Sequence, residues 1–183
     1  MKRTIFFLLY SLVSIGILLL ALMNNTLLHS RIFLLTAILF LGVGLINHFY
    51  EISKLNKESG KEKRNFAKDD LKILIGSTLS ATITWYINHE MGYGAVVANG
   101  FIGVLAATLF TPKLAGIIYT ASFIGMSSQT IIATMPIAGF TGFIAGMIII
   151  LSKDIYVGFG GKGGTSMALS TQLVRLFLSI FRI

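Results

Sequence analysis

The side chains of this chain that could bind a ligand are mostly neutral hydroxyls and amides set within long apolar runs. Asn99 is the clearest case, because a carboxamide has two donors and an acceptor that need partners outside its own helix. We interpret Asn99 either as a hydrogen-bonding contact between helices or as a ligand in a polar pathway. Further along the chain Ser122, Ser127 and Ser128 are candidate binding residues of the same kind.

A second candidate site is the glycine-rich segment GFGGKGG at residues 158–164. Glycine permits positive φ and close backbone approach. We expect Thr165 or Ser166 to cap a final helix, whose unpaired amides and dipole favour anions. The segment therefore predicts a site for a small anion, a phosphate or a lipid headgroup, although a plain hinge would need the same glycines. The candidate residues are Gly160, Gly161, Lys162, Gly163, Gly164 and Thr165.

The sequence offers little for catalysis or metal binding. There is no cysteine, and the three histidines fall at the ends of predicted helices without a metal-binding or serine-hydrolase motif. The glycine-rich segment is not a phosphate-binding P-loop, because its lysine precedes the closing glycines instead of following them. We expect no enzyme activity, catalytic residue, metal or cofactor.

The composition points to a membrane. Of the 183 residues 55% are hydrophobic and 12% are charged, against about 25% charged in a typical soluble domain, and the mean hydropathy is +0.82. About 20 apolar residues cross a bilayer. We predict an all-α integral membrane protein with about six transmembrane helices plus a C-terminal amphipathic, interfacial helix. The expected spans are 4–23, 32–50, 71–88, 93–110, 112–133 and 136–152, and the amphipathic helix is 165–183, with a seventh span as its alternative.

Three regions follow along the chain. Residues 1–50 are an N-terminal pair of transmembrane helices, residues 51–70 a charged cytoplasmic loop, and residues 71–183 a glycine-rich helical membrane bundle that includes the amphipathic helix. Four of the 19 glycines lie in residues 1–70 and the other fifteen lie in the bundle. Small residues let membrane helices approach closely, so we expect tight packing there.

The net charge of +8 comes mainly from basic residues at the ends of apolar blocks. This positive-inside pattern predicts a multi-pass topology with a cytoplasmic N-terminus. No nucleic-acid-binding motif accompanies the charge, so we expect no nucleic acid partner. The expected partners are the lipid bilayer, a second copy in a homo-oligomer, and a protein bound at residues 51–72.

These observations predict membrane transport of a small solute or ion, by a channel, a carrier or a transporter subunit. The alternative is a membrane scaffold or anchor subunit that binds a protein partner through the cytoplasmic loop. A third hypothesis is an intramembrane lipid-modifying enzyme. A polar cavity among the last four spans would favour transport, and a solidly packed bundle would favour the scaffold.

Overall fold

The computed structural model describes residues 28–58, 68–153 and 161–181, together with scattered positions between 5 and 23. It forms two compact units, residues Met1–Arg64 with Ser152–Phe159, and residues Asn65–Leu151 with Gly160–Ile183. The first unit contains α2, Leu28–Glu58, against which Phe7 packs with a ring-centroid distance of 5.8 Å to Phe49. Helix α2 extends into the charged segment that we expected to be a loop, and residues 59–67 lie outside the described part.

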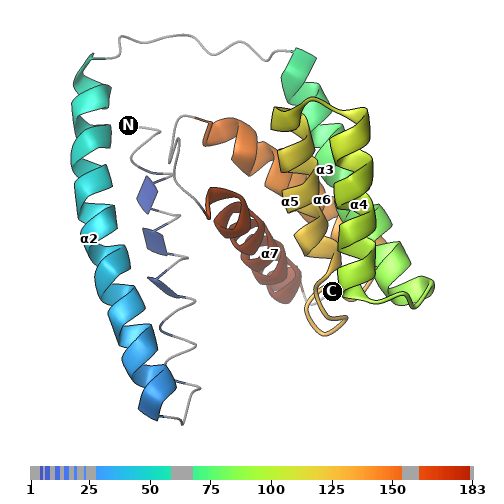
Figure 1. The fold of residues 1–183 in the computed structure, drawn as a ribbon, viewed down its shortest axis with the longest axis horizontal. Coiled ribbons are helices and arrows are strands. Elements are labelled where there is room, and N and C mark those ends of the chain that lie inside the picture. The colour runs from blue at the N-terminus through green and yellow to red at the C-terminus, as the bar shows by residue number, and fades with distance from the viewer. Residues whose placement is uncertain are drawn as a thin grey trace. The chain divides into compact units, whose positions relative to one another are not determined.

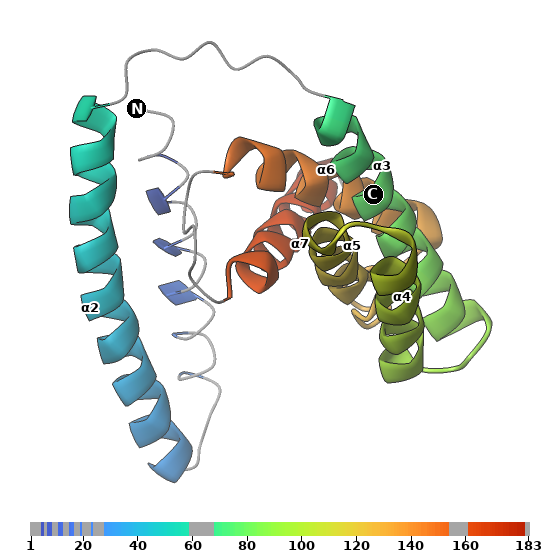
Figure 2. The same ribbon diagram turned by 45° about the horizontal axis from the view of Figure 1, so that its top comes forward.

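The second unit is a bundle of helices (Figure 1). Its elements are α3 Lys68–Trp85, the π-helix η1 Tyr86–Glu90, α4 Ala95–Leu109, α5 Pro112–Gly125, α6 Met135–Leu151 and α7 Lys162–Phe181. Helix α3 packs mainly on α6 and α5, α5 also on α4, and α6 on α7. Figure 2 shows α4 at the edge of this unit, beside α5. The prediction of a mainly helical chain is confirmed.

Local sequence explains where these helices begin and end. Helix α5 begins at Pro112, whose fixed φ and missing N–H suit the first helical position. The turn between η1 and α4 uses Gly92 and Gly94, with φ of 72° and 84°, a region that other residues rarely adopt.

Close packing of α3 on α6 depends on Gly142, where an added Cβ would lie 2.6 Å from the Ser77 carbonyl oxygen.

The predicted transmembrane architecture is contradicted. Within the described ranges, no helix has both the length and the apolar character required to cross a bilayer. The reason is clearest in α4, α5 and α6, which contain 15, 14 and 17 residues. At about 1.5 Å per residue they are shorter than a hydrocarbon core of about 30 Å. The expected span 112–133 ends early because the chain leaves its helix after Gly125.

The predictions that depend on this architecture fail with it. They are the six transmembrane helices, the multi-pass integral membrane location, the positive-inside orientation with a cytoplasmic N-terminus, and the interfacial placement of the last helix. That last helix is present as α7, but it packs on α6 and α5. Its buried residues Met167, Ser170 and Val174 recur at helical spacing. The expected span 4–23 falls largely on residues outside the described part.

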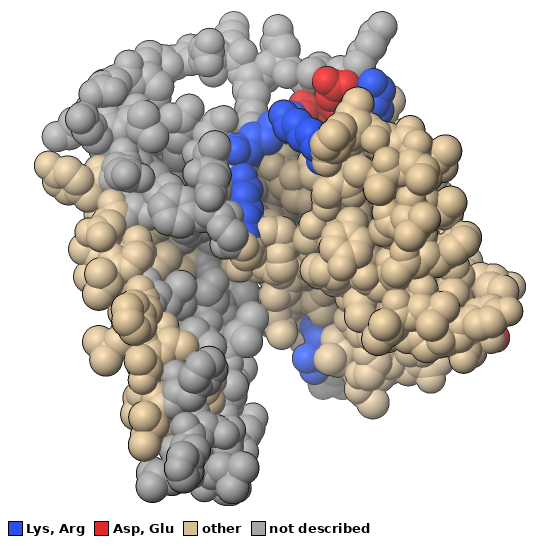
Figure 3. Space-filling model, viewed as in Figure 1, with Lys and Arg blue, Asp and Glu red and all other residues tan. Residues whose placement is uncertain are grey.

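The second unit nevertheless exposes many large apolar side chains. On α4 the side chains of Val96, Val104 and Leu109 are all more than half exposed. Figure 3 shows a broad uncharged surface on this unit, with most of the visible acidic and basic side chains near its upper edge and a few others at its lower and right edges. A large exposed apolar surface usually marks contact with a partner. The lipid bilayer and a second copy of the chain stay predictions for that role.

Candidate functional site

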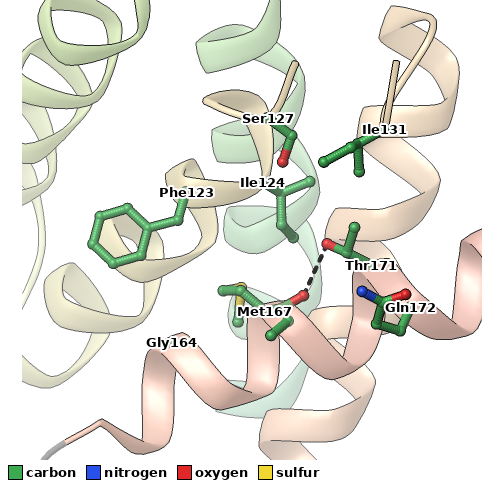
Figure 4. Close-up of a pocket in the computed structure, with 9 residues that line it drawn as sticks. Phe123, Ile124, Ser127, Ile131, Gly164, Met167, Thr171 and Gln172 are labelled. Carbon is green, nitrogen blue, oxygen red and sulfur yellow. Dashed lines mark hydrogen bonds between the residues drawn. The ribbon is translucent and has the colours of Figure 1, made fainter. Parts of the chain in front are cut away.

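The second unit contains a cavity of about 240 Å³ where α5 ends, bounded by the α5–α6 loop (residues 126–134) and one side of α7. Its lining residues are Phe123, Ile124, Ser127, Ile131, Gly164, Met167, Ala168, Thr171 and Gln172. Figure 4 shows Ile124 and Ser127 extending toward α7, where Met167 and Thr171 lie opposite them. The cavity is thus formed by two segments that are far apart in the sequence, the end of α5 with the loop that follows it, and α7.

The apolar side of the cavity belongs to the hydrophobic core. Ile124 and Met167 are 1% and 4% exposed, and both pack in the same buried cluster as Trp85 and Ile132. Buried side chains in a packed core hold one rotamer, because movement would open voids. The cavity therefore has a fixed apolar floor, beside which the more exposed Ile131 lies at the rim.

The polar side of the cavity consists of Ser127, Thr171 and Gln172, all uncharged. The Thr171 hydroxyl donates to the Met167 carbonyl over 2.9 Å, so toward a ligand it can only accept. Among the described residues the Ser127 hydroxyl and the Gln172 carboxamide have no hydrogen-bond partner. Both donor and acceptor capacity is therefore available in the cavity.

One wall of the cavity is fastened to the end of α3 by a tryptophan. Trp85 is 3% exposed, and its indole Nε1 donates to the Ile132 carbonyl over 3.0 Å. Its ring also lies 4.9 Å, centroid to centroid, from the imidazole of His89. Because Ile132 directly follows the lining residue Ile131, the indole fixes the position of the rim.

The π-helix η1 makes a second attachment to the same wall. The Asn88 carboxamide Nδ2 donates to the Gly125 carbonyl over 3.1 Å, and His89 Nε2 lies 2.9 Å from the Ser127 carbonyl oxygen. A carbonyl oxygen can only accept, so this second contact is a hydrogen bond when Nε2 carries the ring proton, whereas the 3.0 Å contact of Asn88 Nδ2 with the same nitrogen needs Nε2 as the acceptor. Short π-helices are frequent at functional sites. Here η1 holds the segment that carries the lining residue Ser127.

The predicted binding residues do not form one site. Asn99 is 6% exposed, and its Nδ2 donates to the Ser122 hydroxyl oxygen over 2.8 Å. This bond joins α4 to α5 and lies outside the cavity lining. Ser127 lines the cavity, whereas Ser128 is exposed and bonds to the Thr130 hydroxyl over 2.7 Å.

The glycine-rich segment is also placed differently from the prediction. Helix α7 begins at Lys162, so Lys162, Gly163 and Gly164 form its first turn and not a loop. Gly161 precedes them with φ of 84°, and Gly160 lies outside the described residues. Of these residues only Gly164 lines the cavity. The predicted anion site at residues 158–165 stays a prediction.

The expected helix cap is wrong. The Thr165 hydroxyl donates to the Gly161 carbonyl over 3.1 Å, and the Ser166 hydroxyl donates to the Lys162 carbonyl over 2.8 Å. Both are bonds to the preceding turn, which hydroxyls make inside a helix. A capping side chain would instead accept from amides that follow it. The roles differ because α7 begins three residues earlier than we expected.

Sequence reasoning missed Gln172, Thr171, Met167 and the apolar lining residues. One signal for them was present, because Gly164, Ala168 and Thr171 recur at spacings of four and three on one side of α7. Small residues at such spacing leave room beside a helix. Within the described residues, no group of acidic and histidine side chains could hold a metal ion.

The Asn99–Ser122 bond leads to a stability prediction. Asn99→Ala should lower the free energy of unfolding by about 1 kcal/mol, the usual net value of one buried hydrogen bond. A double-mutant cycle with Ser122→Ala, followed by chemical denaturation, should give a coupling of about 0.5–1.5 kcal/mol. A coupling near zero would contradict the inter-helix bond. Ligand binding to the cavity should be unchanged in either variant, because neither residue lines it.

Comparison of the chain with protein-family models, with curated protein sequences and with solved structures finds no match.

Proposed function

We propose that the second helical unit binds a small organic solute in the cavity between the end of α5, the α5–α6 loop and α7. The observation that carries this proposal is the combination of a fixed apolar floor with uncharged polar groups that have no partner among the described residues. Ligand pockets typically have this composition, an apolar lining with a few polar groups. The proposal keeps the expected small-solute ligand and needs no helix that crosses a membrane.

The size of the cavity limits the ligand. Pockets for drug-sized molecules have volumes of about 300–1,000 Å³, and this one has about 240 Å³. The occupant should therefore be a small molecule with a short apolar part. The attachments of Trp85 and His89 to the loop and of Asn88 to the last residue of α5 support the proposal, because a wall that is already ordered lowers the entropy cost of binding.

The interior of the helical bundle is closely packed, which bears on the choice between a ligand-binding protein and a scaffold. Four alanines of α3, α5 and α6 are fully buried and belong to one apolar cluster, namely Ala81, Ala121, Ala138 and Ala145. The cavity therefore lies beside this cluster at α7 and not along its centre. A protein partner at residues 51–72 remains the expectation of the scaffold hypothesis, and residues 59–67 of that segment are outside the described part.

Filling the cavity tests the proposal. Ala168→Phe places a ring in the cavity and should abolish saturable binding of hexan-1-ol, because the added side chain occupies the ligand's volume. Binding is measured by the emission of Trp85, the single tryptophan of the chain, which is hydrogen-bonded to the loop that forms the cavity wall.

The matched control is Ala107→Phe, on the exposed surface of α4, which should bind hexan-1-ol like the unmodified chain. Circular dichroism should show equal helix content in both variants. Saturable binding that survives Ala168→Phe would place the binding site elsewhere.

A further inference from the structure

We infer that the cavity selects neutral ligands whose head group both donates and accepts hydrogen bonds, with a primary carboxamide on a short apolar chain as the best-matched class. The inference rests on the proposed function, and it adds the chemistry by which that site discriminates. Gln172 is the main recognition residue, and Ser127 is the second.

The charges of the lining residues favour a neutral head group. No residue that lines the cavity is acidic or basic. A charged ligand group would lose its hydration on entry without gaining a charged partner, which is a large cost. A neutral polar group loses less and can be fully compensated by hydrogen bonds.

The polar lining groups favour a head that is both donor and acceptor. The Gln172 carboxamide has an acceptor oxygen and a donor nitrogen in one plane, so a second carboxamide can form two hydrogen bonds with it. The Thr171 hydroxyl has its proton on the Met167 carbonyl and can only accept. The Ser127 hydroxyl approaches from the opposite wall (Figure 4) and can donate. A ligand that only accepts would leave Thr171 without a donor.

The apolar floor determines the other end of the ligand. Ile124 and Met167 are buried members of the core, and Ile131 lies at the rim. A short alkyl chain would remove this surface from water, at about 0.8 kcal/mol per buried CH₂ group, or nearly fourfold in affinity for each. The head group then decides between ligands of equal chain length.

The inference is tested with three probes of one chain length at neutral pH, hexanamide, hexanoate and hexylammonium, each titrated while Trp85 emission is recorded. Hexanamide should bind about five- to tenfold more tightly than either ion, the factor expected for one or two additional neutral hydrogen bonds. Hexan-1-ol serves as the reference for the apolar contribution. Equal affinity for the amide and for either ion, or tighter binding of an ion, would overturn the inference.

Variants assign the selectivity to a residue. Gln172→Leu should weaken the binding of hexanamide about two- to tenfold relative to hexan-1-ol, because one or two neutral hydrogen bonds are lost, and should retain the binding of hexan-1-ol. Gln172→Glu should reverse the order, with hexylammonium bound more tightly than hexanamide, because a carboxylate attracts the cation. The matched control is Gln129→Leu, in the same loop as Ser127 but outside the cavity lining, and it should keep the original order.

The outcomes separate this inference from the proposed function. If none of the four probes gives a saturable change in the unmodified chain, the proposed binding function fails. If the probes bind but Gln172→Leu leaves the affinity for hexanamide relative to hexan-1-ol unchanged, the binding function stands and the assignment to Gln172 is overturned. Both Gln172 variants change an exposed side chain of α7, so we expect them to fold, and circular dichroism checks their helix content. Ser127→Ala tests the other recognition residue and should weaken the binding of hexanamide more than that of hexan-1-ol.

Discussion

Gly142→Ala should destabilise the helical unit by about 1–3 kcal/mol, the usual cost of forcing one extra group into a packed interior. An added Cβ would lie 2.6 Å from the Ser77 carbonyl oxygen and 2.8 Å from the Ala81 Cβ. The first of these atoms is backbone of α3, so the clash cannot be relieved by rotating a side chain. Helices α3 and α6 would have to separate along their contact.

The matched control for Gly142→Ala is Gly116→Ala, which should change stability in the opposite direction. Gly116→Ala lies within α5, where an added Cβ meets nothing within 4 Å. Alanine is favoured over glycine inside a helix by up to about 1 kcal/mol, so this variant should be slightly more stable than the unmodified chain. Denaturant unfolding followed by Trp85 emission measures both variants. Equal effects of the two substitutions would contradict the close contact of α3 with α6.

Trp85→Ala should have the largest effect of any single substitution proposed, with a loss of about 3–5 kcal/mol. The indole is 3% exposed in the main hydrophobic cluster, so its removal opens a cavity in the core. The Ile132 carbonyl would also lose the hydrogen bond from the indole Nε1, and His89 would lose its ring contact. Unfolding is followed by circular dichroism, because the fluorescent reporter is removed.

Two further variants separate these contributions. Trp85→Phe keeps an aromatic ring but loses the hydrogen bond, and should therefore cost less than the alanine variant. Tyr86→Ala removes the adjacent aromatic side chain, which is 47% exposed, and exposed substitutions usually change stability by about 0.5 kcal/mol or less. If Tyr86→Ala were as damaging as Trp85→Ala, the assignment of Trp85 to the core would be wrong.

Trp85→Phe also connects stability to ligand binding. Trp85 holds the loop segment that includes the lining residue Ile131. A loosened wall must be ordered when the ligand binds, and that entropy cost weakens affinity. We therefore expect weaker binding of hexan-1-ol to Trp85→Phe than to the unmodified chain, measured by calorimetry under conditions where both are folded.

The sequence by itself determined the helical character of the chain and several local features. Within a helix Pro112 fits only the first turn, because proline has no N–H to donate to the preceding turn. Asn99, in an apolar run, needed a polar partner from another helix, and Ser122 supplies it. These features are local or follow from the chemistry of one side chain, so they can be read without the fold.

The tertiary structure alone decided the lengths of the helices, and with them the failure of the transmembrane prediction. A run of apolar residues looks the same whether it is one long helix or a shorter helix followed by a turn. The chain leaves α5 after Gly125, where η1 binds the backbone through Asn88 and His89. Those contacts join residues 37 and 38 positions apart, and no local pattern records them.

The cavity could not be predicted from the sequence, because it too depends on contacts between distant residues. Ser127 comes from the loop after α5 and Gln172 from α7. The sequence indicated Ser127 as a candidate binding residue, but no local pattern places Gln172 beside it. What brings them together is the packing of α7 on α5 and α6, where Gly163 lies so close to Thr120 that a Cβ would approach its Cγ2 to 2.5 Å. A site made by the packing of distant helices exists only once those helices have packed, because its volume is the space their side chains leave unfilled.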